Sequence, residues 1–173
     1  MTKQNKTFII IGVISLILLL TTGTAMGAES IIKLFEGKYL NAYDDGTGRW
    51  TIGYGSIYNY DENRPVKKGD IITEEKALTW LRKEMSAIIP QIKKLVLVPI
   101  TQNQLDSLTS FVYNLGIGSL QSSTLLRLLN AGVDKATVAA EFIKWNKATI
   151  NGKLTVMNGL TARRKAEAEL FLK

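Results

Sequence analysis

The sequence contains neither cysteine nor histidine, and these two absences narrow the chemistry open to the protein. Without cysteine the chain can form no disulfide bond and no thiolate metal site. Without histidine it lacks the usual general base near neutral pH and the commonest zinc ligand. Acid–base chemistry would therefore depend mainly on carboxyl groups whose surroundings tune them. We expect no metal and no cofactor.

The 173 residues suit one folded domain with a sizeable core, because 46% of them are hydrophobic and 21% are charged. A short appendage to this domain is compatible with the length. The formal net charge of +7 suits an anionic partner such as a cell wall, a nucleic acid or a lipid surface. A basic face kept for solubility explains the charge equally well.

The longest uncharged stretch lies near the start of the chain. Lys3 and Lys6 are followed by 22 residues without a charge, from Thr7 to Ala28. This length reaches the roughly 20 residues that a helix needs to span a bilayer, and the preceding positive charges favour a cytoplasmic amino terminus. Residues 21–28 are small and only mildly apolar, so we expect an anchor that can leave the membrane. A cleaved signal peptide, cut near Ala25, is the alternative.

Residues 29–173 then carry the pattern of a catalytic or binding domain, with 1–28 as a separate segment. The sequence predicts an amphipathic helix from Ala28 to Glu36, a small antiparallel hairpin or three-stranded sheet over 38–58, and a polar loop over 59–70. A helix capped by Thr73 should run to about Ile89 and end or kink at Pro90.

The remainder of the chain is predicted to be helical. A capping box of Thr101 and Gln104 opens the central core helix, which Gly116 stops. Further helices are expected over 123–130, from the cap Asp134 to about Lys147, and from the cap Thr161 to Leu170. The fold class is therefore α+β, with a small antiparallel β lobe, a larger helical lobe, and an apolar helix at the amino terminus. We expect ligands to bind in a cleft between the lobes.

Two carboxylic acids and a hydroxyl stand out within sixteen residues. Glu36 ends its helix beside apolar groups, and both the helix dipole and desolvation favour the protonated form there. Asp45 lies in a glycine-rich turn and should stay ionised. Thr51 begins the next β-prone run. One acid and one carboxylate are what glycoside hydrolysis requires, with inversion at a separation of about 6.5–9.5 Å and retention at about 5–5.5 Å. The alternative is that Glu36 only ends a helix and that Asp45 and Thr51 only form a turn and a strand.

The spacing of these residues resembles the catalytic signature of phage-type lysozymes, the endolysins of glycoside hydrolase family 24. Glu36 is followed after eight residues by Asp45, and after five more by Thr51-Ile52-Gly53-Tyr54-Gly55. Two further blocks agree with the family, 104–116 with 123–126 and 159–164 with Glu167, so that the resemblance covers nearly all of 29–173. It implies a lysozyme-like α+β fold.

The resemblance also implies roles for individual residues. Glu36 would be the general acid, Asp45 the base or water-orienting carboxylate, and Thr51 the hydroxyl partner of the water. The bond cleaved would be the β-1,4 link between N-acetylmuramic acid and N-acetylglucosamine in peptidoglycan, which lyses the host cell for phage release. Substrate contacts are expected from Tyr54, Tyr113 and Asn114.

The sequence departs from the family pattern at Ser56, where members often carry a histidine. Any orienting role of that side chain is therefore in doubt. Arg163 and Arg164 repeat a family feature at the start of the last helix. We expect them to cap this helix or to pair with Glu167 rather than to bind the anionic wall directly.

The uncut amino-terminal segment resembles that of signal-anchor-release endolysins. This implies that the host Sec system exports the protein. Residues 7–28 would then hold it in the host inner membrane, facing the periplasm. A holin or pinholin would later release it to the periplasm. We expect a monomer that binds no nucleic acid. A lytic transglycosylase and a non-catalytic, membrane-anchored wall-binding module are the alternative functions.

Overall fold

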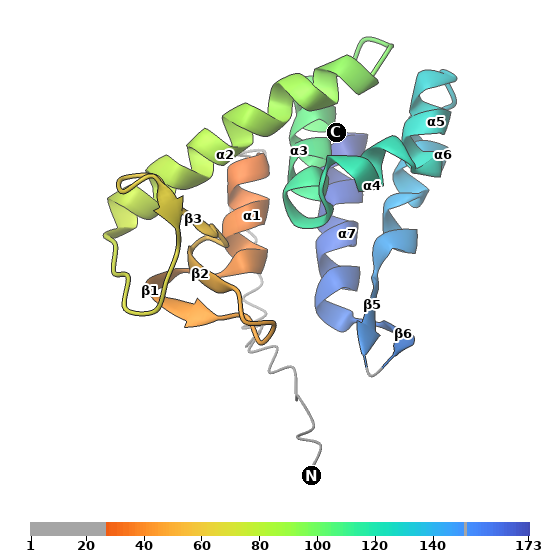
Figure 1. Ribbon diagram of the computed structural model, residues 1–173. Helices are drawn as coiled ribbons and strands as arrows, with labels where there is room; N and C mark the ends of the chain where they lie inside the picture. The colour runs from red at the N-terminus through yellow and green to blue at the C-terminus, as the bar shows by residue number, and fades with distance from the viewer. Residues whose placement is uncertain (1–26, 151) are drawn as a thin grey trace, which may run out of the picture. The chain divides into compact units, whose positions relative to one another are not determined.

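The computed structural model describes residues 27–150 and 152–173, coloured along the chain in Figure 1. These residues form two compact units, which we describe separately. The first runs from Glu36 to Leu81, and the second joins residues 27–35 to Arg82–Lys173. Most of the expected anchor, residues 7–26, lies outside the described residues. Within the part that is described, no helix combines the length and apolar character needed to cross a bilayer.

The first unit is built around a short antiparallel hairpin. Strand β1, Tyr39–Asp44, pairs with β2, Trp50–Gly53, in a register that sets Tyr43 opposite Thr51. A third segment runs beside β1, because Ala42 N–H donates to the Asp70 carbonyl and Ile72 N–H donates to the Leu40 carbonyl, both at 2.9 Å. The expected small antiparallel element is therefore present over 38–58.

The predicted loop over 59–70 contains a second, very short hairpin. Strand β3, Tyr58–Asn59, pairs with β4, Arg64–Pro65. The prediction of a polar loop missed this hairpin, in which polar side chains support a tight turn. The Asn59 carboxamide oxygen accepts from the N–H groups of Asp61 and Glu62 at 3.1 Å each, and Asn63 takes a positive φ of 51°.

Helix α2, Glu74–Leu95, begins where the sequence predicts and ends later. Lys76 N–H donates to the Thr73 hydroxyl at 3.2 Å, which satisfies one of the first free amides. The expected end near Ile89 was wrong, because the helix continues through Pro90, and the alternative expectation of a kink there stays a prediction. Proline removes one backbone hydrogen bond, but the next turn buries Ile92 completely, and this apolar burial offsets the loss.

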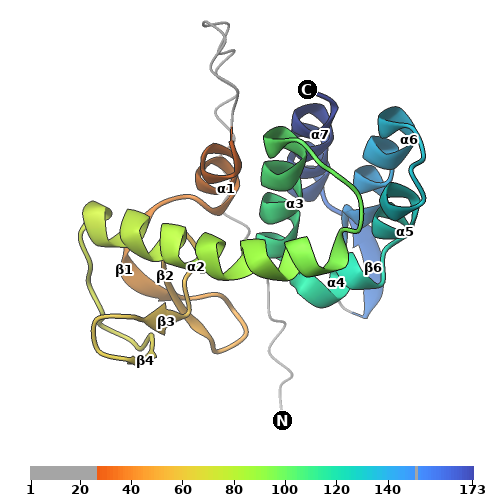
Figure 2. The ribbon, with the colours of Figure 1, turned by 90° about the horizontal axis from the view of Figure 1, so that it is seen from above.

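The second unit is helical. Helix α3, Gln102–Leu115, opens with the predicted capping box and lies beside the last helix, α7, Asn158–Leu172 (Figures 1 and 2). Helix α1, Ala28–Glu36, has the predicted bounds. The shorter helical segments complete the unit: α4 Ile117–Gln121, α5 Thr124–Asn130, α6 Lys135–Ala140 and the 3-10 helix η1 Phe142–Trp145.

Two helix boundaries and one hairpin in this unit differ from the sequence prediction. The helix capped by Asp134 stops at Ala140, and an antiparallel hairpin of β5, Lys147–Ile150, and β6, Lys153–Val156, follows η1. Helix α7 starts at Asn158 and not after Thr161. The Thr161 hydroxyl donates back to the Met157 carbonyl at 3.0 Å, so it acts within the first turn and caps nothing.

The core of the second unit centres on α3, where Leu108 and Phe111 are fully buried. A polar cluster joins α3 to α7 beside this core. One Glu167 carboxylate oxygen accepts from the Ser110 hydroxyl at 2.7 Å and lies 3.2 Å from Arg163 Nε and 2.8 Å from Arg164 Nη2. The predicted pairing of these arginines with Glu167 is confirmed, and it is buried rather than on the surface.

Candidate active site

Glu36 lies at the junction between α1 and the β hairpin. It is the last residue of α1, and Gly37 follows with a φ of +73°, the left-handed conformation that commonly ends helices. The Glu36 carboxylate lies against the backbone of Gly55, since a Cβ built at Gly55 would be 3.3 Å from Glu36 Oε2. Gly55 therefore leaves the space that the carboxylate occupies.

Asp45 is held by the turn between β1 and β2. Its carboxylate Oδ1 accepts from Thr47 N–H at 2.8 Å and from the Thr47 hydroxyl at 2.6 Å, and its own N–H donates to the Arg49 carbonyl at 3.1 Å. The preceding Asp44 carboxylate accepts from the N–H groups of Gly46 and Gly48 at 2.8 and 3.0 Å. Sequence-local hydrogen bonds thus fix both acids within the turn.

The turn keeps Asp45 ionised. Burial acts to raise the pKa of this carboxyl, but the hydrogen bonds from Thr47, the backbone contact with Arg49 and the Arg49 charge together hold the pKa below its usual range. The expectation that Asp45 remains ionised agrees with these contacts. A carboxylate that is ionised at neutral pH can accept a proton from water or stabilise positive charge on a sugar ring.

Thr51 and Tyr43 form a cross-strand pair on the same face of the hairpin as Asp45. Thr51 lies opposite Tyr43 in the β1–β2 register, and Asp45 follows Tyr43 by two residues, which is the period of a strand. Thr51 is buried, with 6% of its surface exposed. Its hydroxyl is thus placed in a protected part of the same element that carries Asp45.

The charges of both acids affect the pKa of Tyr43. Burial, the neighbouring Tyr39, and the negative charges of Glu36 and Asp45 together raise the pKa of Tyr43 to about 12. Its phenol therefore stays protonated at any physiological pH. The ring of Tyr39, whose centroid is 4.4 Å away at an interplanar angle of 44°, packs against the Tyr43 ring. Tyr43 is a hydrogen-bond donor beside the two carboxyl groups.

The other predicted site residues fall in different parts of the chain. Tyr54 lies in the same unit as the acids and is buried, with 3% of its surface exposed. Ser56 is buried too, and its hydroxyl donates to the Tyr58 carbonyl at 3.0 Å, so this serine supports the backbone after β2. Tyr113 and Asn114 lie on α3 of the second unit, where the Tyr113 hydroxyl donates to Glu84 Oε2 at 2.7 Å. Substrate contact by Tyr54, Tyr113 and Asn114 stays a prediction.

Sequence reasoning did not single out Tyr43 or Gly55. The signal for Tyr43 was the strand alternation, which places residues 43 and 45 on one face. The signal for Gly55 was weaker, because its place beside Glu36 depends on the tertiary fold and on a φ of +98°. Neither position could be recognised from composition or spacing alone.

Comparison with known proteins places this site in a family. The model of the family described as phage lysozyme matches residues 33–167, which is most of the chain and includes Glu36, Asp45 and Thr51. The chain belongs to the phage lysozyme family.

Individual relatives agree with this assignment. The chain is 43% identical over 141 residues to the endolysin of Acyrthosiphon pisum secondary endosymbiont phage 1, covering 82% of this chain and 92% of the relative. It is 34% identical over 128 residues to a SAR-endolysin of Enterobacteria phage H19B, covering 71% and 70%. The solved endolysin of Escherichia coli O157:H7 phage FAHEc1 superposes with a TM-score of 0.78 at 41% identity, covering 84% of this chain and 90% of that one.

Family membership defines the general activity. The chain is a glycoside hydrolase of the phage lysozyme type, an endolysin that lyses host peptidoglycan. The fold is the α+β, lysozyme-like arrangement of small antiparallel sheets and a helical unit.

Proposed function

We propose that the chain hydrolyses the β-1,4 bond between N-acetylmuramic acid and N-acetylglucosamine, with Glu36 as proton donor and Asp45 and Thr51 directing the attacking water. The observation that carries this proposal is the grouping of the three residues around Tyr43, which pairs with Thr51 and senses the charges of both acids. The match of the phage lysozyme family over residues 33–167, a range that includes all three residues, adds support.

The chemistry divides between the two acids. Glu36 gives its proton to the glycosidic oxygen as the bond breaks, which removes the cost of expelling an alkoxide. Positive charge develops on the sugar ring, and the ionised Asp45 stabilises it and accepts a proton from the water that attacks the ring carbon. Thr51 orients that water through its hydroxyl. The product is a hydrolysed sugar end, and the starting state returns when Asp45 releases its proton to solvent and Glu36 takes one up.

The products of digestion test this assignment against a lytic transglycosylase, which needs one catalytic glutamate and no water. Purified peptidoglycan is digested and the new sugar ends are analysed by mass spectrometry. Hydrolysis adds the mass of one water to each cut, and we expect Asp45→Asn to lose most of the activity. Anhydro sugar ends, together with full activity of Asp45→Asn, would replace the proposal with transglycosylation.

We further propose that residues 1–28 form a releasable membrane anchor ahead of a catalytic domain at 29–173. The 22 uncharged residues from Thr7 to Ala28 behind Lys3 and Lys6 support it, as does the similarity to a SAR-endolysin. Export would use the host Sec system, and a holin or pinholin would release the protein from the host inner membrane into the periplasm. It would act there as a monomer.

The described start of the chain suggests how release is linked to folding. Gly27 fits closely against α3, because a Cβ at this position would lie 3.0 Å from Asp106 Oδ2. Glu29 pairs with Arg82 at 2.9 Å, and Ala28, Ile31 and Ile32 are buried. The residues next to the anchor are thus part of the folded unit, and Glu36 ends the same helix. A membrane-held segment would pull on this helix, and its release would let the helix dock.

Release without cleavage is tested by intact-mass measurement of the protein from membrane and soluble fractions, before and after the membrane is depolarised. A full-length mass that moves from the membrane to the soluble fraction is the expected result. A shortened mass in the soluble fraction would show a cleaved signal peptide. As a second arm, the segment is replaced by a cleaved signal peptide, and unchanged timing of lysis would remove any regulatory role from residues 1–28.

A further inference from the structure

The β5–β6 hairpin of the helical unit exposes two large apolar side chains. All four residues of β6, Lys153–Val156, are exposed, and Leu154 and Val156 keep 63% and 53% of their surface in contact with solvent. Because residues two apart in a strand project on the same side, these two side chains form one apolar strip. Scattered exposed apolar residues are normal on a soluble protein, whereas neighbouring ones mark an interaction site.

The strip lies among polar and cationic side chains. In the β5–β6 register, Thr149 is opposite Leu154 and Lys147 is opposite Val156, and cross-strand partners share a face. We call these four residues the outer face of the hairpin. Lys153 is exposed next to it, at the start of β6. Within residues 27–150 and 152–173, neither Lys147 nor Lys153 is in an ion pair. The outer face therefore combines apolar surface with positive charge.

The chain around the hairpin has no acidic residue. From Phe142 to Ala166 the sequence contains six cationic residues and no acidic one. The helical unit, residues 27–35 and 82–173, carries fourteen cationic and seven acidic residues, whereas the hairpin unit, residues 36–81, carries six and eight. The excess positive charge of residues 27–173 thus lies entirely in the unit that carries β5–β6, where it attracts an anionic partner.

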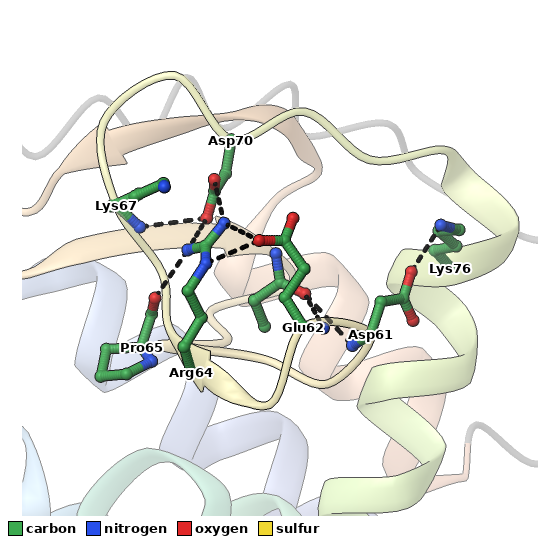
Figure 3. A network of polar contacts seen from close by, with 8 residues as sticks. Asp61, Glu62, Arg64, Pro65, Lys67, Asp70 and Lys76 are labelled. Carbon is green, nitrogen blue, oxygen red and sulfur yellow. Dashed lines mark hydrogen bonds and ion pairs between the residues drawn. The ribbon is translucent and has the colours of Figure 1, made fainter.

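Three cations of the hairpin unit have carboxylate partners, and two of these pairs are drawn in Figure 3. Arg64 donates to both oxygens of Asp70 at 2.8 Å each, and Lys76 pairs with Asp61. Such pairs leave little charge for a partner. The two lysines of the β5–β6 hairpin differ from them, because no acid neighbours them in the sequence and their charge stays available for binding.

The hairpin lies at one end of the helical unit. In Figure 1 it is beyond the start of α7, at the opposite end of this unit from the loop that joins α2 to α3. Four residue pairs join its strands, from Lys147 with Val156 to Ile150 with Lys153. The outer face is therefore formed before any partner arrives, and binding loses little conformational entropy.

We propose that the outer face of the β5–β6 hairpin docks on an anionic phospholipid surface. Leu154 and Val156 enter the boundary between headgroups and acyl chains, and Lys147 and Lys153 lie among the phosphates. The apolar strip favours lipid over a hydrated anionic polymer of the wall, which offers it no apolar partner. The lysines disfavour a second copy of the chain, because two such faces repel each other. This contact is separate from the proposed anchor in residues 1–28.

A fluorescent probe on the outer face tests the docking in the full chain. The sequence has no cysteine, so Thr149→Cys gives a single labelling site for an environment-sensitive dye. Ala131→Cys, at an exposed position after α5, gives the matched control. The vesicles contain phosphatidylcholine alone, or equal parts of phosphatidylcholine and phosphatidylglycerol. If residues 7–28 insert, they insert in both, so the difference between the two kinds of vesicle reports on the hairpin.

We expect the probe at position 149 to shift its emission to the blue on the anionic vesicles alone. The shift should shrink strongly at about 1 M salt, where the Debye length is about 3 Å. The probe at position 131 should not respond. No response at position 149, or equal responses at both positions, would overturn the proposal.

Charge substitutions at Leu154 separate docking by this face from general adsorption. Leu154→Asp, Leu154→Lys and Leu154→Asn all remove the apolar side chain and differ in charge, and each is combined with the Thr149→Cys probe. The docking equilibrium constant on anionic vesicles should be about fivefold lower in Leu154→Asp than in Leu154→Asn, and should hold or rise in Leu154→Lys. The control is Leu97→Asp, since Leu97 is 78% exposed in the loop between α2 and α3. Equal constants in the three Leu154 variants, or an equal loss in Leu97→Asp, would contradict docking by the outer face.

Lys147→Gln provides a second arm, with Lys93→Gln as its matched control. Lys93 is an exposed cation on α2, in the same unit as the hairpin. Removing one lysine from an anionic surface should weaken docking about fivefold, so the constant should fall in Lys147→Gln and stay near wild type in Lys93→Gln. Equal losses would show that the net charge of the unit causes the attraction, and would reject the assigned role of the hairpin.

Two further measurements keep the other outcomes apart. Analytical ultracentrifugation without vesicles looks for self-association: dimers that Leu154→Asp dissociates, together with no probe response to vesicles, would assign the face to a second copy. Purified peptidoglycan contains no lipid, so Leu154→Asp should cut it at the wild-type rate. Failure of the wild type to cut would reject the proposed function and leave the probe response unaffected.

Discussion

The Glu36 carboxylate occupies space that any side chain at position 55 would need. Gly55 has a φ of +98°, and a Cβ added at this position would lie only 3.3 Å from Glu36 Oε2. The position of the Glu36 carboxylate therefore depends on its own helix and equally on Gly55, the residue after β2 that has no Cβ. This makes Gly55 a sensitive probe of the site.

We expect Gly55→Ala to lower kcat on peptidoglycan by about three- to tenfold, because the added methyl presses on the Glu36 carboxylate and displaces it by a few tenths of an ångström. The control is Gly69→Ala, which has a similar φ of +87° but no atom within 4 Å of its added Cβ. Both variants carry the backbone strain. Equal activities for the two would show that strain, and not contact with Glu36, explains the loss.

Asp70 makes the stability of the hairpin unit depend on pH in the acidic range. Hydrogen bonds from Arg64 are the largest influence and, with the Lys67 backbone N–H, hold the pKa of Asp70 far below its usual range despite its desolvation. A depressed pKa in the folded state stabilises the fold above the unfolded pKa of about 3.9, and this stabilisation is lost progressively as the pH falls from that value through the lower pKa of the folded state.

The wild-type melting temperature should therefore drop more steeply between pH 5 and pH 3 than that of Asp70→Asn. Thermal unfolding at several pH values measures this difference. Other acids with lowered pKa, such as Asp134, contribute equally to both proteins and leave the difference intact. Parallel curves for the two proteins would mean that the Arg64–Asp70 pair does not contribute to acid stability.

At the level of single residues, the sequence was enough to choose Glu36, Asp45 and Thr51 as the candidate site. Their spacing along the chain carries the information, and the turn that fixes Asp45 is made of its own neighbours. Tyr43 and Gly55 required the structure, because their importance comes from contacts between segments that no local pattern encodes.

Helices α2, α3, α5 and α6 begin where their side-chain caps predict, whereas α7 begins ahead of the predicted cap Thr161. The Thr101 capping box is a local arrangement: the Thr101 hydroxyl accepts from Gln104 N–H at 3.2 Å, and the Gln104 side chain accepts from Thr101 N–H at 2.8 Å. The start of α3 could therefore be predicted from Thr101 and Gln104 alone. The passage of α2 through Pro90 depends on the burial of Ile92, so it was not predictable from local sequence. The β5–β6 hairpin was predictable, because Asn151-Gly152 separates its two strands and this pair is a strong hairpin signal, which the sequence prediction missed.

Loss of the capping box should lower the free energy of unfolding. Thr101→Ala removes the hydroxyl acceptor at the start of α3, and we expect a loss of about 1 kcal/mol in urea unfolding. Thr79→Ala is the control, because the Thr79 hydroxyl donates to the Glu75 carbonyl inside α2 and alanine is the better helix former there. A loss in Thr79→Ala as large as in Thr101→Ala would contradict the assigned role of the cap.

For the whole molecule, the proposed proton donor and the proposed anchor are joined by one helix. Helix α1 follows directly on the uncharged segment and ends at Glu36, while its buried face packs within the helical unit. The proposed proton donor is therefore placed by the docking of α1 and by the hairpin that carries Asp45 and Thr51. The absence of histidine from the sequence leaves carboxyl groups to do this work.

The central claim is that Glu36 donates the proton that breaks the glycosidic bond. The most direct measurement is kcat/KM of Glu36→Gln on purified peptidoglycan, with Glu74→Gln as the control, since Glu74 is an acid of the same unit that pairs with Lys38 on the surface. We predict that Glu36→Gln loses about a hundredfold or more at an unchanged melting temperature, and that Glu74→Gln stays near wild type. Substantial activity in a folded Glu36→Gln protein would contradict the account.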